Sequence, residues 1–231
     1  MDTADSRKIS VIIPVYEERE MIASAIENVR SKGEDVEVIV VDGGSSDGSH
    51  EIAAGLARIE VSKKGRAVQM NKGARKASGD ILLFLHTDTS LPDHSFKHIK
   101  ESFIDPDVIG GRFRIELTGK GLGYRTISAM INIRDRIFGG FTGDQAIFID
   151  RQRFFEIGGY KDIPLFEDLD LARKMRRRGK VVRIPDHVVS SNRRWAKKGL
   201  MRTIVKMWLL RLLYLVGVSP ETLAKVYKDV R

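Results

Sequence analysis

The stretch from Asp80 to Asp88, DILLFLHTD, constrains the fold of this chain most strongly. A turn residue opens it, five apolar residues follow, and it ends in His86, Thr87 and Asp88. A short apolar run bounded by turn signals predicts a strand that is buried on both faces of a mostly parallel sheet. Because ligands of open α/β sheets bind at the carboxyl ends of strands, His86 and Asp88 are candidate site residues. The competing interpretation is that a polar pair merely ends a strand.

The first ninety residues alternate strand and helix patterns, which predicts a doubly wound, mostly parallel α/β sheet with helices on both faces. The expected strands are 10–15, 36–41, 59–62 and 80–85, and the expected helices are 20–30, a segment that starts near Ser49, and 65–77. The second half is less regular, with expected strands at 110–118, 145–150 and 181–184 and expected helices at 92–103, 124–138, 151–157 and 166–178. The strand at 110–118 is expected to be antiparallel or at an edge.

Composition excludes several classes of protein. The chain has 231 residues and no cysteine, so neither a disulfide framework nor a thiolate metal site can form. The net charge is +9, but the basic residues of the last third do not alternate with aromatic residues, which argues against a nucleic-acid groove. The first ten residues lack the apolar region of a secretory signal, and no apolar run is long enough for a transmembrane helix. We therefore expect a cytoplasmic protein that binds no nucleic acid.

Residues 200–216 are strongly apolar and are interrupted by Arg202, Lys206 and Arg211. We expect these three basic residues to lie in one sector of an amphipathic helix. Such a helix packs on its own domain or on a second subunit. The alternative is a peripheral contact with the inner face of a membrane, because basic residues beside Trp208 suit a membrane surface.

Both standard phosphate-binding loops are absent. The residues after the first strand are PVYEERE rather than GxGxxG, and the chain contains no GxxxxGK[ST] sequence. A nucleotide must therefore be held in another way. Asp42, at the end of the second strand, can accept hydrogen bonds from a base or a ribose, although an aspartate before two glycines is also an ordinary turn residue.

The candidate metal site is the end of the strand that opens this section. Asp88 offers a hard oxygen ligand, and Mg²⁺ or Mn²⁺ is normally bound by one or two protein groups together with substrate phosphates. His86 as a second ligand would favour Mn²⁺. Glu167 and Asp168 lie at the start of a helix, where acidic residues also serve simply to complement the helix dipole.

A further candidate binding feature is the basic and aromatic sequence Arg193-Arg194-Trp195. Its guanidinium groups suit a diphosphate, and a solvated charge run is the alternative.

In combination these features resemble the family 2 glycosyltransferases of the GT-A fold. The segments that carry the resemblance are SVIIPVYEE, VVDGGSSDGS, GRAVQMNKGA, FLHTD and FEDLDLARKMRRRG, so it covers nearly the whole chain. The third of these segments and the tail that begins SNRRWAKKG are similar to a small, soluble bacterial and archaeal subgroup associated with arsenosugar or selenium gene clusters. The resemblance implies a GT-A domain over 1–199, with a nucleotide-binding half at 1–90 and an acceptor and catalytic half at 91–199, followed by amphipathic helices at 200–231.

The resemblance also implies roles for individual residues. Asp168, or alternatively Glu167, is the general base, and Asp88 with His86 holds the metal. The implied donor-binding residues are Pro14, Tyr16, Glu18, Asp42, Arg66, Asn71, Thr87, Arg194 and Trp195. The implied acceptor residues, from position in the family pattern alone, are Gly143, Asp144 and Gln145.

Two positions depart from the family pattern. His86 replaces the first carboxylate of the usual DxD metal motif, so Asp88 is the main protein ligand. Ser191 stands where the QxxRW motif has glutamine, so that motif is half present.

The function expected from the sequence is an inverting, metal-dependent transfer of a sugar from a nucleotide-diphosphate sugar to an acceptor. The cofactor is Mn²⁺ or Mg²⁺, and the acceptor is a small molecule or a lipid-linked phosphate. Two alternatives remain, a sugar nucleotidyltransferase and a non-catalytic nucleotide-sugar-binding protein. The first requires a glycine-rich loop after the first strand, which PVYEERE does not provide.

Overall fold

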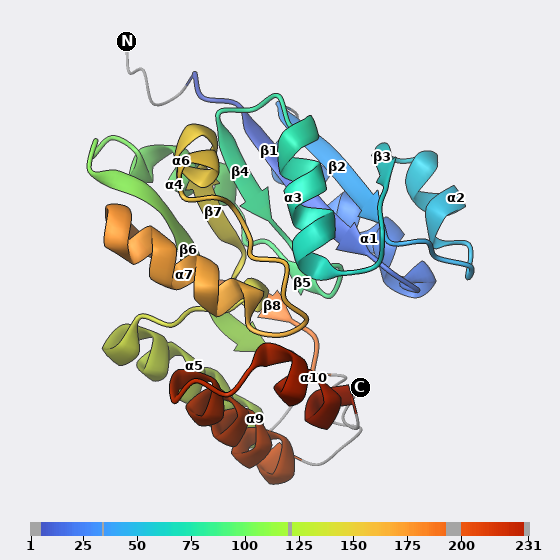
Figure 1. Ribbon diagram of the computed structural model, residues 1–231. Helices are drawn as coiled ribbons and strands as arrows, with labels where there is room; N and C mark the ends of the chain where they lie inside the picture. Colours follow the sequence, from blue (N-terminus) through green and yellow to red (C-terminus); the bar gives the residue numbers. More distant parts are fainter. Residues whose placement is uncertain (1–5, 34, 120–121, 193–199, 229–231) are drawn as a thin grey trace.

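The computed structural model of the protein describes residues 6–33, 35–119, 122–192 and 200–228. An eight-stranded sheet with the order β3-β2-β1-β4-β7-β6-β8-β5 runs through it, with helices on both faces (Figure 1). The strands are β1 (Ile9–Val15), β2 (Val36–Asp42), β3 (Arg58–Val61), β4 (Ile81–Phe84), β5 (Thr89–Ser90), β6 (Val108–Leu117), β7 (Ile147–Asp150) and β8 (Lys180–Ser190). The helices are α1 (Arg19–Arg30), α2 (Ser49–Ala54), α3 (Arg66–Lys76), α4 (Ser95–Ser102), α5 (Leu122–Phe138), η1 (Gly143–Gln145), α6 (Arg151–Glu156), α7 (Glu167–Arg178), α9 (Leu200–Leu215) and α10 (Pro220–Lys228).

The first half confirms the predicted doubly wound arrangement. β1 pairs in parallel with both β2 and β4, and β2 pairs in parallel with β3. β4 lies in the middle of the sheet and all four of its residues are buried, as its apolar run predicts. β2 and β3 lie on one side of β1, and β4 lies on the other side, so the order of strands reverses at β1. Ligands of such sheets bind at the carboxyl ends of the strands where the order reverses.

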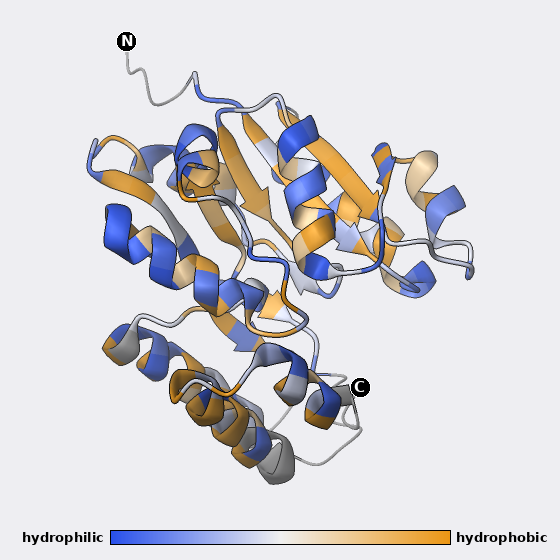
Figure 2. Cartoon of the chain, in the orientation of Figure 1, coloured by the Kyte–Doolittle hydropathy of each residue, from blue (hydrophilic) through white to orange (hydrophobic). Residues whose placement is uncertain are grey.

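Two hydrophobic layers explain why the helices pack as they do. Alternate residues of β1 point to opposite faces of the sheet. Val11 and Ile13 belong to the hydrophobic cluster that includes residues of α1 and α4. Ile12 belongs to the cluster that includes residues of α3, α6 and α7. Figure 2 shows the sheet strands as mainly hydrophobic and the helices that cover them as carrying many hydrophilic residues, whereas α9 is also largely hydrophobic.

The second half differs from the expected pattern in two places. β6 is antiparallel to β7, which is one of the two expected alternatives, but it is not at an edge, because it also pairs in parallel with β8. β8 continues to Ser190, beyond the expected end at residue 184. Its register skips Pro185 and Asp186 between the pairs Phe113–Ile184 and Arg114–His187. A bulge accommodates a proline inside a strand, so the strand does not stop there.

A buried ion pair fixes α5 to the sheet. Arg112 of β6 donates to both carboxylate oxygens of Asp135, with its Nη2 2.7 Å from Oδ1, and the Asp135 side chain is fully buried. Asn132, one turn away, bonds both the backbone nitrogen and the backbone oxygen of Ile115. These contacts set the rotation of α5 about its own axis.

We expect Asp135→Leu to lower the free energy of unfolding by about 3–5 kcal/mol, because it leaves the Arg112 guanidinium buried without its partner. Urea denaturation measures this loss. The double variant Arg112→Met/Asp135→Leu removes both charges and should recover most of the stability. A loss in the double variant equal to that in the single variant would show that packing, not the unpaired charge, is responsible.

The C-terminal helices form a separate small cluster. Leu210 of α9 and Leu223 and Tyr227 of α10 pack against Leu165 and Phe166, which precede α7. α9 and α10 lie beside α5 at the lower end of the sheet in Figure 1. Over the part of the chain that the structure describes, no helix is both long and apolar enough to cross a membrane.

Candidate active site

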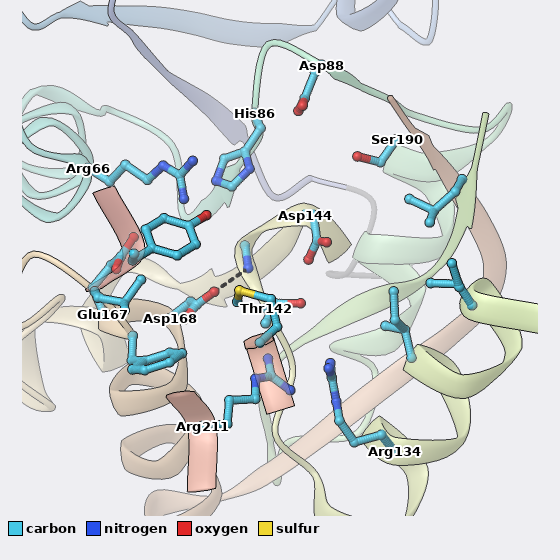
Figure 3. A pocket seen from close by; sticks show the side chains of 18 of the residues that line it. Arg66, His86, Asp88, Arg134, Thr142, Asp144, Glu167, Asp168, Ser190 and Arg211 are labelled. Atoms are coloured by element: carbon cyan, nitrogen blue, oxygen red, sulfur yellow. Dashed lines mark hydrogen bonds between the residues drawn. The ribbon is translucent and has the colours of Figure 1, made fainter. Parts of the chain in front are cut away.

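One cavity of about 150 Å³ lies where the end of β4 faces the starts of α3 and α7. The inner faces of α5 and α9 close its other end (Figure 3). Its polar and charged lining consists of Arg66, His86, Asp88, Arg134, Thr142, Asp144, Glu167, Asp168, Ser190, Ser191, Arg211 and Tyr227. The cavity therefore brings together residues from both halves of the chain.

His86 and Asp88 leave β4 at one end of this cavity, together with Arg66 from the start of α3. His86 packs closely on Gly143, since a Cβ atom on Gly143 would lie 2.8 Å from its Nε2. Burial alone would lower the pKa of Arg66, but the nearby acidic groups Glu167, Tyr227, Asp168 and Asp88 raise it above its usual value. This end of the cavity thus combines a carboxylate, an imidazole and a fixed positive charge.

Asp168 is held at the start of α7 by two backbone hydrogen bonds. The Gly143 nitrogen donates to Oδ2 over 3.0 Å, and the Leu169 nitrogen donates to Oδ1 over 2.7 Å. Phe166 enters the helix with a positive φ of 69°, a sparsely populated conformation for a non-glycine residue that is often found at functional sites. Because a carboxylate has about four lone-pair positions, Asp168 can still accept a proton from a group in the cavity.

Glu167 lines the cavity next to Asp168, and the charges of both carboxylates act on the hydroxyl of Tyr160. Glu167 is only 6% exposed, and it is the largest contributor to raising the pKa of Arg66. The Tyr160 hydroxyl is buried and forms no hydrogen bond with any described residue. Burial, followed by the negative charges of Asp168 and Glu167, raises the pKa of Tyr160 well above its usual value, so this phenol stays protonated.

Other predicted donor residues lie outside this cavity. Asp42 is 2% exposed and accepts hydrogen bonds from the Ser45 hydroxyl and backbone nitrogen. Its second oxygen lies 3.3 Å from His50 Nδ1. Pro14, Tyr16, Glu18 and Thr87 also do not line the cavity.

Two further predicted residues have structural hydrogen bonds. Asn71 donates to the Tyr160 carbonyl over 2.8 Å and accepts from the Tyr160 nitrogen over 3.0 Å. Gln145 is fully buried, and its amide contacts the Phe113 carbonyl, Asp135 and the Thr142 nitrogen. Of the predicted acceptor residues, only Gly143 and Asp144 line the cavity. The residues Arg193, Arg194 and Trp195 lie outside the described residues, whereas Ser191 lines the cavity.

Sequence reasoning missed Arg134 and Arg211 as site residues, and it placed Arg211 in the wrong sector of its helix. Lys206 and Arg211 are five positions apart, which is a rotation of about 140° rather than a shared sector. Arg211 points into the cavity and is largely buried (Figure 3). A lone arginine opposite the other basic residues of an apolar helix was the signal that could have identified it.

The described residues fit a divalent cation only if a substrate supplies further ligand atoms. Among the described residues, no group of three or more His, Asp or Glu side chains is arranged to hold a metal ion. Asp88 nevertheless presents a carboxylate to the cavity, with His86 beside it. Mg²⁺ and Mn²⁺ often take one or two protein ligands and complete their shell with phosphate oxygens, which matches this sparse set of ligands.

Comparison with known proteins places these features in a family context. The sequence pattern of Glycosyl transferase family 2 matches residues 10–161. An undecaprenyl-phosphate 4-deoxy-4-formamido-L-arabinose transferase of Aeromonas hydrophila is 29% identical over 124 residues, covering 48% of this chain and 38% of that protein. Glycosyltransferase AglE of Haloferax volcanii is 40% identical over 93 residues, covering 36% of this chain and 31% of AglE. The chain thus spans well under half the length of these curated relatives.

Solved structures share the fold. The mannosyltransferase PcManGT from Pyrobaculum calidifontis, in complex with GDP-Man and Mn²⁺, superposes with a TM-score of 0.68 at 19% identity, over 96% of this chain and 69% of that chain. Glucosyl-3-phosphoglycerate synthase from Mycobacterium tuberculosis, in complex with Mn²⁺, UDP and glucosyl-3-phosphoglycerate, gives a TM-score of 0.59 at 21% identity, over 90% of this chain and 80% of that chain. At these identities the similarity establishes the GT-A fold.

Proposed function

Because this chain belongs to glycosyl transferase family 2, we propose that it transfers a sugar from a nucleotide-diphosphate sugar to an acceptor, with inversion at the anomeric carbon and with a divalent metal ion. The observation that carries the proposal is the cavity in which Asp88, His86 and Arg66 face Asp168. A cation site for a leaving diphosphate and a carboxylate for an attacking group are the two parts that such a transfer needs.

In the proposed reaction the acceptor oxygen attacks the anomeric carbon from the side opposite the diphosphate. The new carbon–oxygen bond forms as the bond to the diphosphate oxygen breaks, and the leaving oxygen keeps the electron pair. When the acceptor group is a hydroxyl, Asp168 takes its proton, and a positioned base of this kind contributes about 10²–10⁴-fold in rate. Its two backbone hydrogen bonds fix the direction of the carboxylate without using all of its lone pairs.

The donor end of the cavity stabilises the departing diphosphate in this proposal. Arg66 keeps its positive charge because acidic neighbours raise its pKa. Asp88, with His86 beside it, would hold Mn²⁺ or Mg²⁺, and a bound cation supplies positive charge where negative charge develops on the leaving group. The solved relatives with GDP-Man and Mn²⁺ or with UDP and Mn²⁺ support this choice of ligands.

The remaining donor contacts rest on the family pattern. Pro14, Tyr16 and Glu18 would line the nucleoside pocket beside Asp42, and Arg194 with Trp195 would contact the diphosphate. Residues 1–90 would form the nucleotide-binding half, residues 91–199 the acceptor half, and residues 200–231 a helical addition. The subgroup associated with arsenosugar or selenium gene clusters stays a prediction from the sequence, as does a contact of residues 200–216 with a membrane or a second subunit.

A panel of nucleotide-diphosphate sugars with and without Mn²⁺ tests the proposal by thermal shift. We expect one donor to raise the melting temperature only when Mn²⁺ is present. A ligand at 100 times its dissociation constant should stabilise the protein by about 2.7 kcal/mol. Incubation of that donor with the protein and Mn²⁺ should also release the nucleoside diphosphate slowly by hydrolysis.

The second candidate function is non-catalytic binding of a nucleotide sugar, favoured by the histidine at the first position of the metal motif. Metal-dependent donor binding without any release of nucleoside diphosphate would support that candidate. A panel in which no nucleotide sugar binds would contradict both functions.

A further inference from the structure

Two arginines at the far end of the cavity have no assigned role. Arg134 comes from α5 and Arg211 from α9, and both guanidinium groups point into the cavity (Figure 3). The Nε and Nη2 atoms of Arg134 are buried and have no hydrogen-bond partner among the described residues. Within that part of the chain, no ion pair of 4.0 Å or less joins either arginine to a carboxylate.

This arrangement is unfavourable for the protein by itself. Burial, followed by the positive charge of Arg211, lowers the pKa of Arg134 to about 10. Asp144 and Asp168 act in the opposite direction but form no ion pair with it. A buried charge without a partner is costly, and a second buried charge of the same sign increases the cost. Both guanidinium groups remain protonated at neutral pH, so an anion that enters the cavity would gain two charge-assisted partners.

The positions of the two arginines indicate whether this anion belongs to the donor or to the acceptor. Figure 3 shows Asp88 and His86 at one end of the cavity, Arg134 and Arg211 at the other, and Asp168 between them. In an inverting transfer the acceptor approaches from the side opposite the diphosphate, and the diphosphate lies with Asp88. The arginine end is therefore the acceptor end.

We propose that Arg134 and Arg211 bind a phosphate group carried by the acceptor. The inference rests on the proposed function for its assignment to the acceptor. Two planar guanidinium forks match the tetrahedral oxygens of a phosphate better than they match a neutral sugar hydroxyl. Thr142 and Asp144, from the turn that leads into β7, line the same part of the cavity and would contact the atoms next to that phosphate.

The two helices that carry the arginines also contribute apolar residues to the cavity wall. These are Ile127, Met130 and Ile131 of α5 and Met207 and Trp208 of α9. The outer sides of both helices also expose apolar residues, with Ile133 56% and Leu212 58% exposed. The phosphate could therefore come from a lipid headgroup or from a water-soluble phosphate ester, and the two sources require separate arms of one experiment.

The first arm titrates the full chain with sodium phosphate at an ionic strength held constant with sodium chloride, because screening alone weakens surface contacts. We expect Arg134→Gln and Arg211→Gln each to raise the dissociation constant for phosphate at least about tenfold, which corresponds to about 1.4 kcal/mol. Arg136→Gln is the matched control, because Arg136 is exposed on the same helix. It should bind phosphate as the wild type does. If a glutamine variant does not fold, Arg134→Lys or Arg211→Lys keeps the charge and should bind phosphate more weakly because it lacks the guanidinium fork.

Three results of the first arm overturn the inference. They are no saturable phosphate binding in the millimolar range, equal binding by the wild type and both arginine variants, and loss of binding only in Arg66→Gln. The last result would place the phosphate at the donor end instead.

The second arm uses phosphatidylcholine vesicles that contain either phosphatidic acid, a phosphate monoester, or the same molar fraction of phosphatidylglycerol, a diester. Sedimentation with phosphatidic acid vesicles that is lost in Arg134→Gln indicates a lipid source. Phosphate binding without such sedimentation indicates a water-soluble phosphate ester. Sedimentation that is equal for both lipids and unchanged in Arg134→Gln is a surface effect of the net charge, and the source is then assigned by the first arm as water-soluble.

The nucleotide-sugar panel separates this inference from the proposed function. Both arginine variants should bind the donor with Mn²⁺ as the wild type does. If the wild type and both arginine variants bind the donor and also bind phosphate equally well, the inference is overturned and the proposed function is not. Phosphate binding through the arginines in a protein that binds no nucleotide sugar would overturn the proposed function and leave an anion site.

Discussion

Asp168→Asn is expected to keep donor binding and to lose about 10²–10⁴-fold of the transfer rate to an acceptor hydroxyl. The amide has nearly the shape of the carboxylate but cannot take a proton from the acceptor. It also replaces one oxygen that accepts a backbone hydrogen bond from Gly143 or Leu169. We therefore expect a loss in stability of about 1–3 kcal/mol, the cost of an unsatisfied buried donor.

Initial rates of nucleoside diphosphate release, measured with and without acceptor, test this expectation. Asp162→Asn is the control, because Asp162 is exposed on the segment before α7. Glu167→Gln distinguishes the role of Glu167 from that of Asp168, because removal of the Glu167 charge is expected mainly to lower the pKa of Arg66. Full turnover by a folded Asp168→Asn enzyme on a hydroxyl acceptor would show that Asp168 is not the base.

Asp88→Ala is expected to abolish metal-dependent donor binding. Substitution of groups that only support metal ligands typically costs about 10–100-fold in metal affinity, so removal of the main ligand should cost at least about 100-fold. The effect should be large here because the described residues offer no cluster of three or more acidic or histidine ligands to compensate. Calorimetric titration of the donor at several Mn²⁺ concentrations measures it.

Two variants sharpen this result. Asp93→Ala removes an exposed carboxylate that pairs with Lys32 outside the cavity, and it should not change donor affinity. His86→Gln tests the imidazole, and a shift of preference from Mn²⁺ toward Mg²⁺ would identify His86 as a ligand. Donor binding by Asp88→Ala that still responds to Mn²⁺ would place the metal elsewhere.

The first half of the fold followed from local sequence patterns. The apolar runs at β1, β2 and β4 and the helical spacing in α1 and α3 are properties of short segments, and the βα alternation leaves few topologies. The second half was less predictable. The bulge at Pro185 and Asp186 lets β8 continue, and no local pattern shows that β6 is internal rather than at an edge. Such features depend on which strands become neighbours.

The candidate site, like the fold, was predictable from the sequence only in part. Asp88 was a candidate because it ends a strand with a clear apolar pattern, and Asp168 and Arg66 were candidates from the family resemblance. The structure places all three on one cavity, and their roles stay predictions. Asn71 and Gln145 were expected to contact substrates, but their amides bond the backbone of Tyr160 and of Phe113. An amide side chain gives no sign in the sequence of whether its partner is a ligand or the protein.

The sequence by itself determined the family, the parallel half of the sheet and the strand end that carries Asp88, because these depend on residues close together in the chain. Only the tertiary structure decided that Arg134 and Arg211 share the cavity with Asp168. The rotation of α5 is fixed by the Arg112–Asp135 pair, and the position of α9 by the packing of Leu210 beside Phe166. Contacts between distant segments choose which side chain faces the cavity, and a helical pattern alone leaves that choice open.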